Sequence, residues 1–185
     1  MKTERRDQIR REAARVLLRM NLGSFYAMGM LDLRRHQDAL GCLMDSIGAF
    51  CDRSSMARPH PSPQGMTVRD GDLTLILYDE TLPSHRRNFT IAHEIGHLVL
   101  GHTTPSPEAE READAFAAAF LAPNVLIGAW EEVHGERMSP RQIEMNFSVC
   151  ALTAKRKRLE MDGQDRGVFS EEEKRLARRL FEKTE

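Results

Sequence analysis

Several features that would place a protein in a class at once are scarce in this sequence of 185 residues. There are three cysteines, Cys42, Cys51 and Cys150, and their odd number and wide spacing exclude a disulfide framework or a paired CxxC metal knuckle. This cysteine usage favours a reducing compartment. A formal net charge of -1 gives no support to a binder of polyanions that depends on overall charge.

Long apolar segments are scarce as well. The first twenty residues carry charges throughout, unlike the apolar centre of a secretory signal peptide. No uninterrupted stretch approaches the roughly 20 apolar residues that cross a bilayer. With 41% apolar and 30% charged residues the composition is that of an ordinary globular protein, and we expect it to be cytoplasmic.

The sequence does contain a succession of helical patterns around one pair of strand patterns. Apolar residues at helical spacing predict a first helix that carries Ile9 to Met20 and ends near Gly23, and a second one from Asp32, as N-cap, to about Gly48. Strands are predicted over 66–69 and 73–78, joined by a turn at Asp70-Gly71. Further helices are predicted over 89–100, 108–121, 140–147 and 149–161, and from the capping box Ser170 to Glu173 onward.

His93, Glu94 and His97 form an HExxH sequence inside the helix predicted over 89–100. At 3.6 residues per turn the two histidines project from one face, where their imidazoles can bind one Zn²⁺. Glu94 lies on the adjoining strip of the helix and can act as general base toward a water molecule. Zinc lowers the pKa of such a water to about 7. The pattern therefore indicates a zinc-dependent hydrolase, with Glu94 as the catalytic residue.

The apolar surroundings of the motif favour a bound metal over a chance occurrence of the pattern. Two histidines and a glutamate are costly in a buried helix unless they are bound or paired. The apolar residues of this helix are Phe89, Ile91, Ala92, Ile95, Leu98, Val99 and Leu100.

A catalytic zinc needs a third protein ligand. The metzincin pattern is excluded, because Leu100 and Thr103 occupy the positions at which it requires glycine and histidine. His102 follows the predicted helix-ending Gly101, so we expect it to cap or pack.

The next helix supplies a better third ligand. Glu110 and Asp114 are four residues apart on one face, so Glu110 can reach the zinc while Asp114 accepts a hydrogen bond from a ligating histidine. This ExxxD arrangement resembles that of the gluzincin peptidases. Glu112 points about 160° away from Glu110 on an ideal helix, so only one of them can bind the metal. We favour Glu110, with Glu112 as the alternative on a solvated face.

Two blocks of the sequence resemble the ImmA/IrrE family of metallopeptidases. They are RNFTIAHEIGHL, over 87–98, and EREADAFAAAFLAP, over 110–123, and the later NFSVCALTAKRKRLEMDG resembles a closing pattern of that family. Cys150 departs from that pattern, which usually has a polar or acidic residue there. The resemblance implies an α+β fold, mainly helical, with a small antiparallel sheet packed beside the HExxH helix. It also implies His93, His97 and Glu110 as zinc ligands and Glu94 as catalytic base.

On this reading, residues 1–52 form an N-terminal helical region, 53–163 the ImmA/IrrE-like core and 164–185 a C-terminal helix, within one compact domain. The resemblance further implies cleavage of a cytosolic protein, a helix-turn-helix transcriptional repressor that is often encoded nearby. The alternative is a metal-binding regulatory module that binds a partner protein or DNA without hydrolysis.

A basic run and three isolated polar residues also have the chemistry for DNA binding or catalysis. Residues 141–160 could form a helix-turn-helix with a basic run over 155–158, but we expect Val149, Leu152 and Leu159 to pack and the basic run to be solvated. Direct DNA binding is therefore not expected. Tyr78, Arg87 and His134 could each donate to a tetrahedral oxyanion, and the sequence favours none of them.

Overall fold

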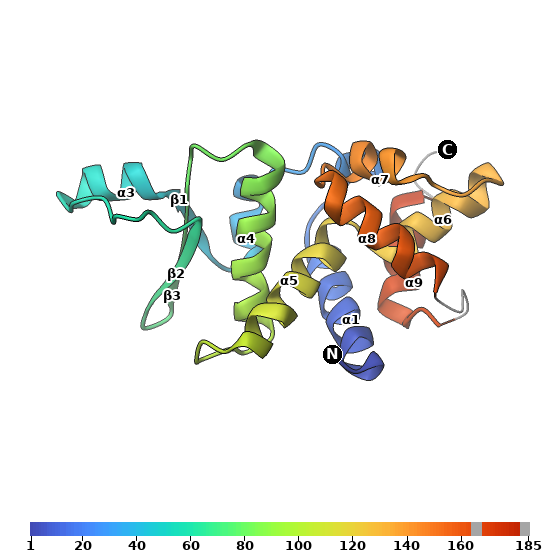
Figure 1. The fold of residues 1–185 in the computed structure, drawn as a ribbon, viewed down its shortest axis with the longest axis horizontal. Helices are drawn as coiled ribbons and strands as arrows, with labels where there is room; N and C mark the ends of the chain where they lie inside the picture. Colours follow the sequence, from blue (N-terminus) through green and yellow to red (C-terminus); the bar gives the residue numbers. More distant parts are fainter. Residues whose placement is uncertain (164–167, 182–185) are drawn as a thin grey trace.

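The computed structural model describes residues 1–163 and 168–181, and it places a small sheet at one end of a group of helices (Figure 1). The helices are α1 (Thr3–Arg19), α2 (Gln37–Leu40), α3 (Ile47–Ser54), α4 (Ser84–Val99), α5 (Pro107–Leu121), α6 (Asn124–His134), α7 (Pro140–Phe147), α8 (Ala151–Asp162) and α9 (Glu171–Phe181). Two 3-10 turns, η1 (Phe25–Met28) and η2 (Leu33–His36), precede α2. The predicted α+β, mainly helical class is confirmed. Of the predicted segment 164–185, residues 164–167 and 182–185 lie outside the described part.

Three strands form a mixed sheet in the order β1-β3-β2, namely β1 (Leu43–Ser46), β2 (Gly65–Asp70) and β3 (Leu73–Tyr78). The predicted antiparallel hairpin is present, and Gly65 pairs with Tyr78 at its open end. Its loop is Gly71 and Asp72, one residue later than predicted, because Asp70 still pairs with Leu73. Gly71 has a φ of +55°, which a glycine adopts without strain.

Strand β1, which pairs in parallel with β3, was not predicted from the sequence. The single helix predicted from Asp32 to about Gly48 is wrong, since Gly41, at a φ of +68°, ends α2 and turns the chain toward the sheet. Asp32 is still an N-cap, but only of η2, where its carboxylate accepts a hydrogen bond from the Arg34 amide. The apolar spacing of this segment suits a helix as well, and hydrogen bonds to β3 select the strand.

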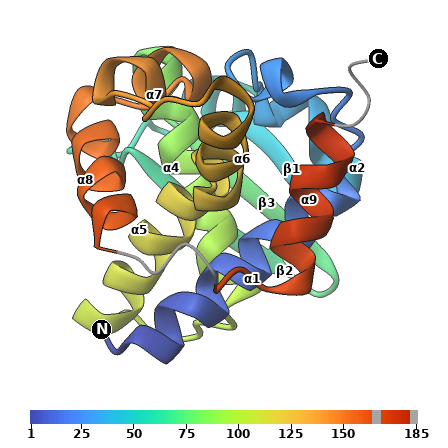
Figure 2. The same ribbon diagram turned by 90° about the vertical axis from the view of Figure 1, so that its right-hand side faces the viewer.

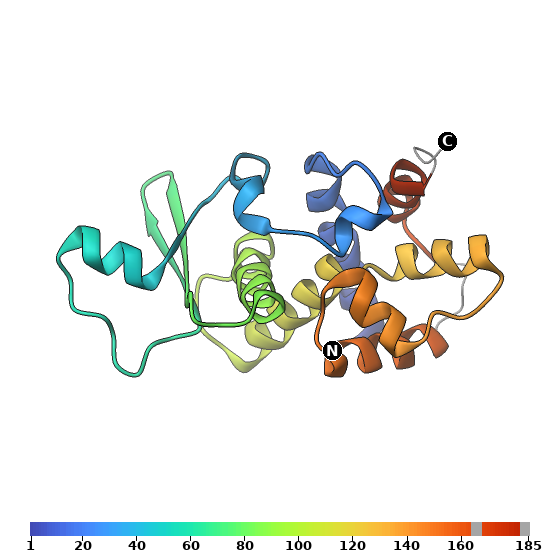
Figure 3. The ribbon, with the colours of Figure 1, turned by 90° about the horizontal axis from the view of Figure 1, so that it is seen from above.

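The two faces of β3 contact different helices, as the alternation of strand side chains requires. Ile76 and Tyr78 belong to the main core, together with Ile91 and Ile95 of α4. Leu77 packs instead with Ile47 and Cys51 of α3 in a second, smaller cluster. The sheet therefore lies between α3 and α4 (Figure 3).

Helix α4 starts at Ser84, before the predicted start at Phe89, and it ends at Val99, with Leu100 as C-cap and Gly101 next at a φ of +73°. Helix α5 crosses α4 closely, because a Cβ on Gly96 would already lie 3.2 Å from the Ala113 Cα atom. On its other side α5 packs against α1, and α9 lies along α1 (Figure 2). The pair α4 and α5 thus forms the centre of the molecule.

One stretch of the described residues, Pro107–His134, has the length and mean hydropathy of a membrane-crossing helix. It comprises α5 and α6, which meet at Pro123, and 72% of its most apolar window is buried inside the fold. Core helices also have this character.

Candidate metal centre

The two histidines of HExxH meet on the face of α4 that borders a cleft of about 660 Å³. Their Nε2 atoms lie 3.0 Å apart, so both rings present the same nitrogen to one point. Each side chain is 19% exposed, which leaves a path from the cleft to that point. The spacing of four residues therefore places both imidazoles on one face of the helix, as predicted from the sequence.

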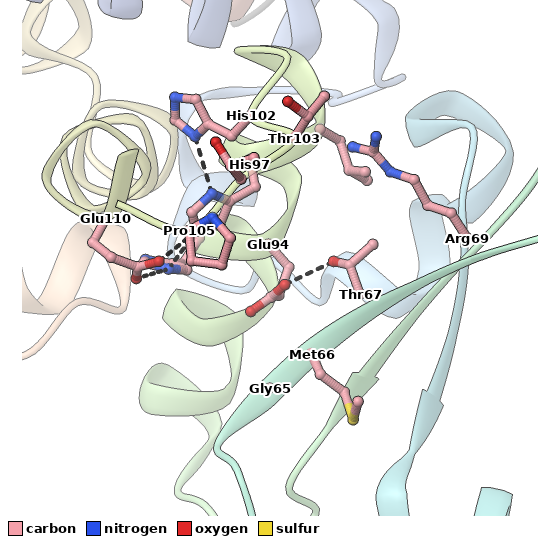
Figure 4. A pocket seen from close by; sticks show the side chains of 13 residues that line it. Gly65, Met66, Thr67, Arg69, Glu94, His97, His102, Thr103, Pro105 and Glu110 are labelled. Carbon is pink, nitrogen blue, oxygen red and sulfur yellow. Dashed lines mark hydrogen bonds and ion pairs between the residues drawn. The ribbon is translucent and has the colours of Figure 1, made fainter. Parts of the chain in front are cut away.

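Glu110 reaches the same point from α5 (Figure 4). Its carboxylate oxygens lie 3.2 Å from Nε2 of His93 and 3.5 Å from Nε2 of His97. Ligands about 2.1 Å from a tetrahedral zinc are separated by about 3.4 Å, so these three groups fit that ion. Two imidazoles and one carboxylate are also a ligand set of catalytic zinc with a fourth, open position.

Asp114 lies where the sequence analysis placed it, one turn after Glu110. Its Oδ1 atom is 2.9 Å from Nδ1 of His93, and this contact favours a proton on Nδ1 and a free lone pair on Nε2. Burial lowers the pKa of His93, but the hydrogen bond and charge of Asp114, with Glu94 and Glu110, raise it above its ordinary value. The pKa of His97 is lowered, by burial first and then by His93.

Glu112 faces away from the two histidines, as the 160° separation from Glu110 requires. It does not lie on a solvated face, however, since its side chain is only 9% exposed. Arg5 of α1 donates to its carboxylate at 2.8 Å, and His102 contacts it at 3.1 Å. The hydrogen bond from Arg5, the larger effect, and that of His102 lower the pKa of Glu112 to about 2, so it is ionised near neutral pH.

His102 caps α4, as expected, and it also contacts a candidate ligand. Its amide donates to the His97 carbonyl at 3.0 Å, while Gly101 donates to Leu98, which is the Schellman pattern of helix ends. Its Nδ1 atom lies 3.0 Å from Nδ1 of His97. His102 therefore stands behind His97, on the side opposite the convergence of the Nε2 atoms.

Strand β2 supplies residues of the cleft that the sequence analysis did not identify. Thr67 donates to Oε2 of Glu94 at 2.7 Å, and Arg69 lines the cleft from the same strand (Figure 4). The strand lies close to α4, because a Cβ on Gly65 would meet Thr90 at 2.3 Å. No local pattern marks Thr67 or Arg69, since polar side chains on a half-exposed strand are common.

The three candidate oxyanion donors do not line this cleft. Tyr78 is buried at the end of β3, and the Arg87 guanidinium lies over its ring at 5.9 Å. His134 ends α6 and its Nδ1 bonds to the Trp130 carbonyl at 2.8 Å. The structure assigns all three to packing or to surface positions away from the histidine pair.

The basic run over 155–158, expected to be solvated, is so only in its first half: Lys155 and Arg156 are exposed, whereas the next two residues are buried. Lys157 is 3% exposed and bonds to Asn124, and Arg158 is 9% exposed and pairs with Glu131. Conversely, Leu152 and Leu159, expected to pack, are 59% and 73% exposed. Ion pairs to neighbouring helices therefore set the orientation of α8, which its apolar spacing had not predicted. Val149, the other residue expected to pack, is buried.

An HExxH helix beside a small sheet, with a carboxylate facing it from the following helix, defines a domain of the metallopeptidase class. Residues 57–151 match the family model described as the IrrE N-terminal-like domain, which is 95 of the 185 residues. The chain belongs to this peptidase family, as the resemblance to ImmA/IrrE proteins had indicated. Among curated proteins no match was found.

Proposed function

We propose that the chain is a zinc-dependent endopeptidase that cleaves a cytosolic protein, and that His93, His97 and Glu110 bind the metal. The convergence of these three side chains on one point carries the proposal, because their nitrogen and oxygen atoms lie within 4.8 Å of one another. The matched family supports the peptidase activity. A helix-turn-helix repressor as substrate is supported by the ImmA/IrrE resemblance alone.

When bound, zinc supplies a Lewis acid that polarises the scissile carbonyl and lowers the pKa of water to about 7. Glu94 takes a proton from the attacking water and returns it to the leaving amine. Thr67 occupies Oε2 of Glu94 and so leaves the other carboxylate oxygen for this proton. Asp114 holds the ring of His93 so that its Nε2 faces Glu110.

The position of the cleft suits an extended peptide as substrate. It is bordered by β2, which within the described residues pairs on one side only, with β3. A peptide can add to a free strand edge through main-chain hydrogen bonds. Such binding places the peptide beside Glu94, and it requires a substrate segment that can unfold locally.

Co-expression with a candidate substrate, a helix-turn-helix repressor encoded near this gene, tests the activity. Glu94→Gln is expected to retain zinc and repressor binding while the cleavage rate falls by about 10²–10⁴-fold. Glu132→Gln makes the same change on α6, away from the cleft, and serves as the control. If Glu94→Gln leaves the biological output unchanged, the non-hydrolytic binding module becomes the better explanation.

Metal content tests the site independently of activity. The wild-type chain is expected to hold one zinc that survives dialysis, and His93→Ala to hold none. Retention of one zinc by His93→Ala would eliminate the proposed site. Glu110→Gln is expected to lose the zinc on dialysis and Glu112→Gln at most to bind it more weakly, because only Glu110 contacts the Nε2 atoms of His93 and His97.

A further inference from the structure

Four side chains form a line that leads from the candidate metal centre to helix α1. Nδ1 of His97 lies 3.0 Å from Nδ1 of His102, and Nε2 of His102 lies 3.1 Å from Oε2 of Glu112. Arg5 closes the line with two hydrogen bonds to Glu112, one of them 2.8 Å long. The line joins α4, α5 and α1. Its last two residues, Glu112 and Arg5, are 107 positions apart in the sequence.

The donor and acceptor of each hydrogen bond follow from the protonation of His97 at one end of the line and of Arg5 at the other. If Nε2 of His97 binds zinc, the neutral ring carries its proton on Nδ1 and donates it to Nδ1 of His102. His102 must then carry its own proton on Nε2, and it donates this proton to Glu112. The guanidinium of Arg5 can only donate, so each donor on the line meets an acceptor.

Burial of His102 and Glu112 restricts His102 to one position of its proton. The side chain of His102 is 12% exposed and that of Glu112 is 9% exposed, so water competes weakly for either. The ring of His102 also packs edge-on against that of His97, with centroids 5.0 Å apart. A reversed proton on His102 would turn its Nε2 lone pair toward the Glu112 carboxylate, which is repulsive.

We propose that His102, Glu112 and Arg5 are positioning residues that hold His97 in its Nδ1-protonated form and orientation, and thereby set the affinity for zinc. This inference rests on the proposed function. His93 and His97 are then oriented in different ways: His93 contacts the carboxylate of Asp114 directly, whereas His97 reaches that of Glu112 through His102. It also gives helix α1, which lies outside the matched residues 57–151, a role at the metal centre.

Zinc affinity, measured by competition with a chelator, tests the proposal without reference to cleavage. His102→Phe keeps a ring but removes both hydrogen bonds, and it is expected to weaken zinc binding by about 10–100-fold. His102→Asn is expected to recover part of this loss, because its Oδ1 can accept from His97. His134→Phe makes the same change outside the cleft and should bind zinc like the wild type.

A spectroscopic measurement on the wild-type protein covers the case in which His102→Phe does not fold. In the zinc-loaded chain, imidazole ¹⁵N NMR should report a proton on Nδ1 of His97 and on Nε2 of His102. A proton on Nδ1 of His102 would overturn the inference, as would equal zinc affinity of His102→Phe and wild type. If the wild type takes up no zinc, or His93→Ala retains it, the proposed function itself fails.

Discussion

The contact between Arg5 and Glu112 leads to a quantitative prediction for Arg5→Met. This substitution removes the guanidinium from a carboxylate whose side chain is 9% exposed, while methionine retains an unbranched apolar stem. Removing the partner of a fully buried charge costs about 3–5 kcal/mol, whereas an exposed pair contributes about 0–1 kcal/mol. The Arg5 side chain is 32% exposed, so we expect an intermediate loss of about 1–3 kcal/mol.

Urea unfolding of the zinc-free protein near neutral pH measures this loss. The midpoint should fall without a change in the dependence on urea concentration, because the surface exposed on unfolding stays the same. Arg15→Met is the matched control, since Arg15 lies on the same helix and its side chain is 50% exposed. We expect that control to unfold like the wild type.

A double-mutant cycle separates the pair from other effects of the substitution. In a Glu112→Gln background the charge that Arg5 neutralises is gone, so Arg5→Met should cost much less there. Additive losses would contradict the coupling. A free energy of unfolding for Arg5→Met within about 0.5 kcal/mol of wild type would refute the reasoning from burial, since ordinary surface substitutions reach that size.

Three further substitutions test the cleft and its two helices. Thr67→Val should lower kcat about tenfold with KM unchanged, because the hydrogen bond that orients Glu94 is lost. A kcat equal to that of the wild type in steady-state kinetics would contradict this role. Gly96→Val should lower the free energy of unfolding in urea by about 1–3 kcal/mol and weaken zinc binding, since an added Cβ meets Ala113 at 3.2 Å. Unchanged stability would exclude this close packing. Glu110→Gln should release zinc on dialysis, and full zinc occupancy would require another third ligand.

Local patterns were sufficient for most of the helices and for the centre of the site. The predicted capping box at Ser170 opens the last helix, and a capping box at Ser139 opens α7, because these hydrogen bonds form within one turn. The HExxH face is local in the same sense, since its geometry depends only on the helical repeat. The missed strand β1 shows the limit, because its partner β3 lies about thirty residues away and supplies the hydrogen bonds that select a strand.

The sequence by itself determined that His93 and His97 share a face, that Glu94 lies beside them, and that Glu110 and Asp114 share a face of the next helix. It restricted the candidates for a third ligand to Glu110 and Glu112, but only the packing of α5 on α4 placed Glu110 at the Nε2 atoms of His93 and His97.

The environment of the other glutamate was decided by tertiary structure alone. Glu112 is buried because α1 brings Arg5 to it from the far end of the chain, and His102 joins it to His97 at the candidate metal centre. No periodicity encodes such contacts. A buried charge is costly unless it is paired, and the fold can supply the partner from any part of the sequence.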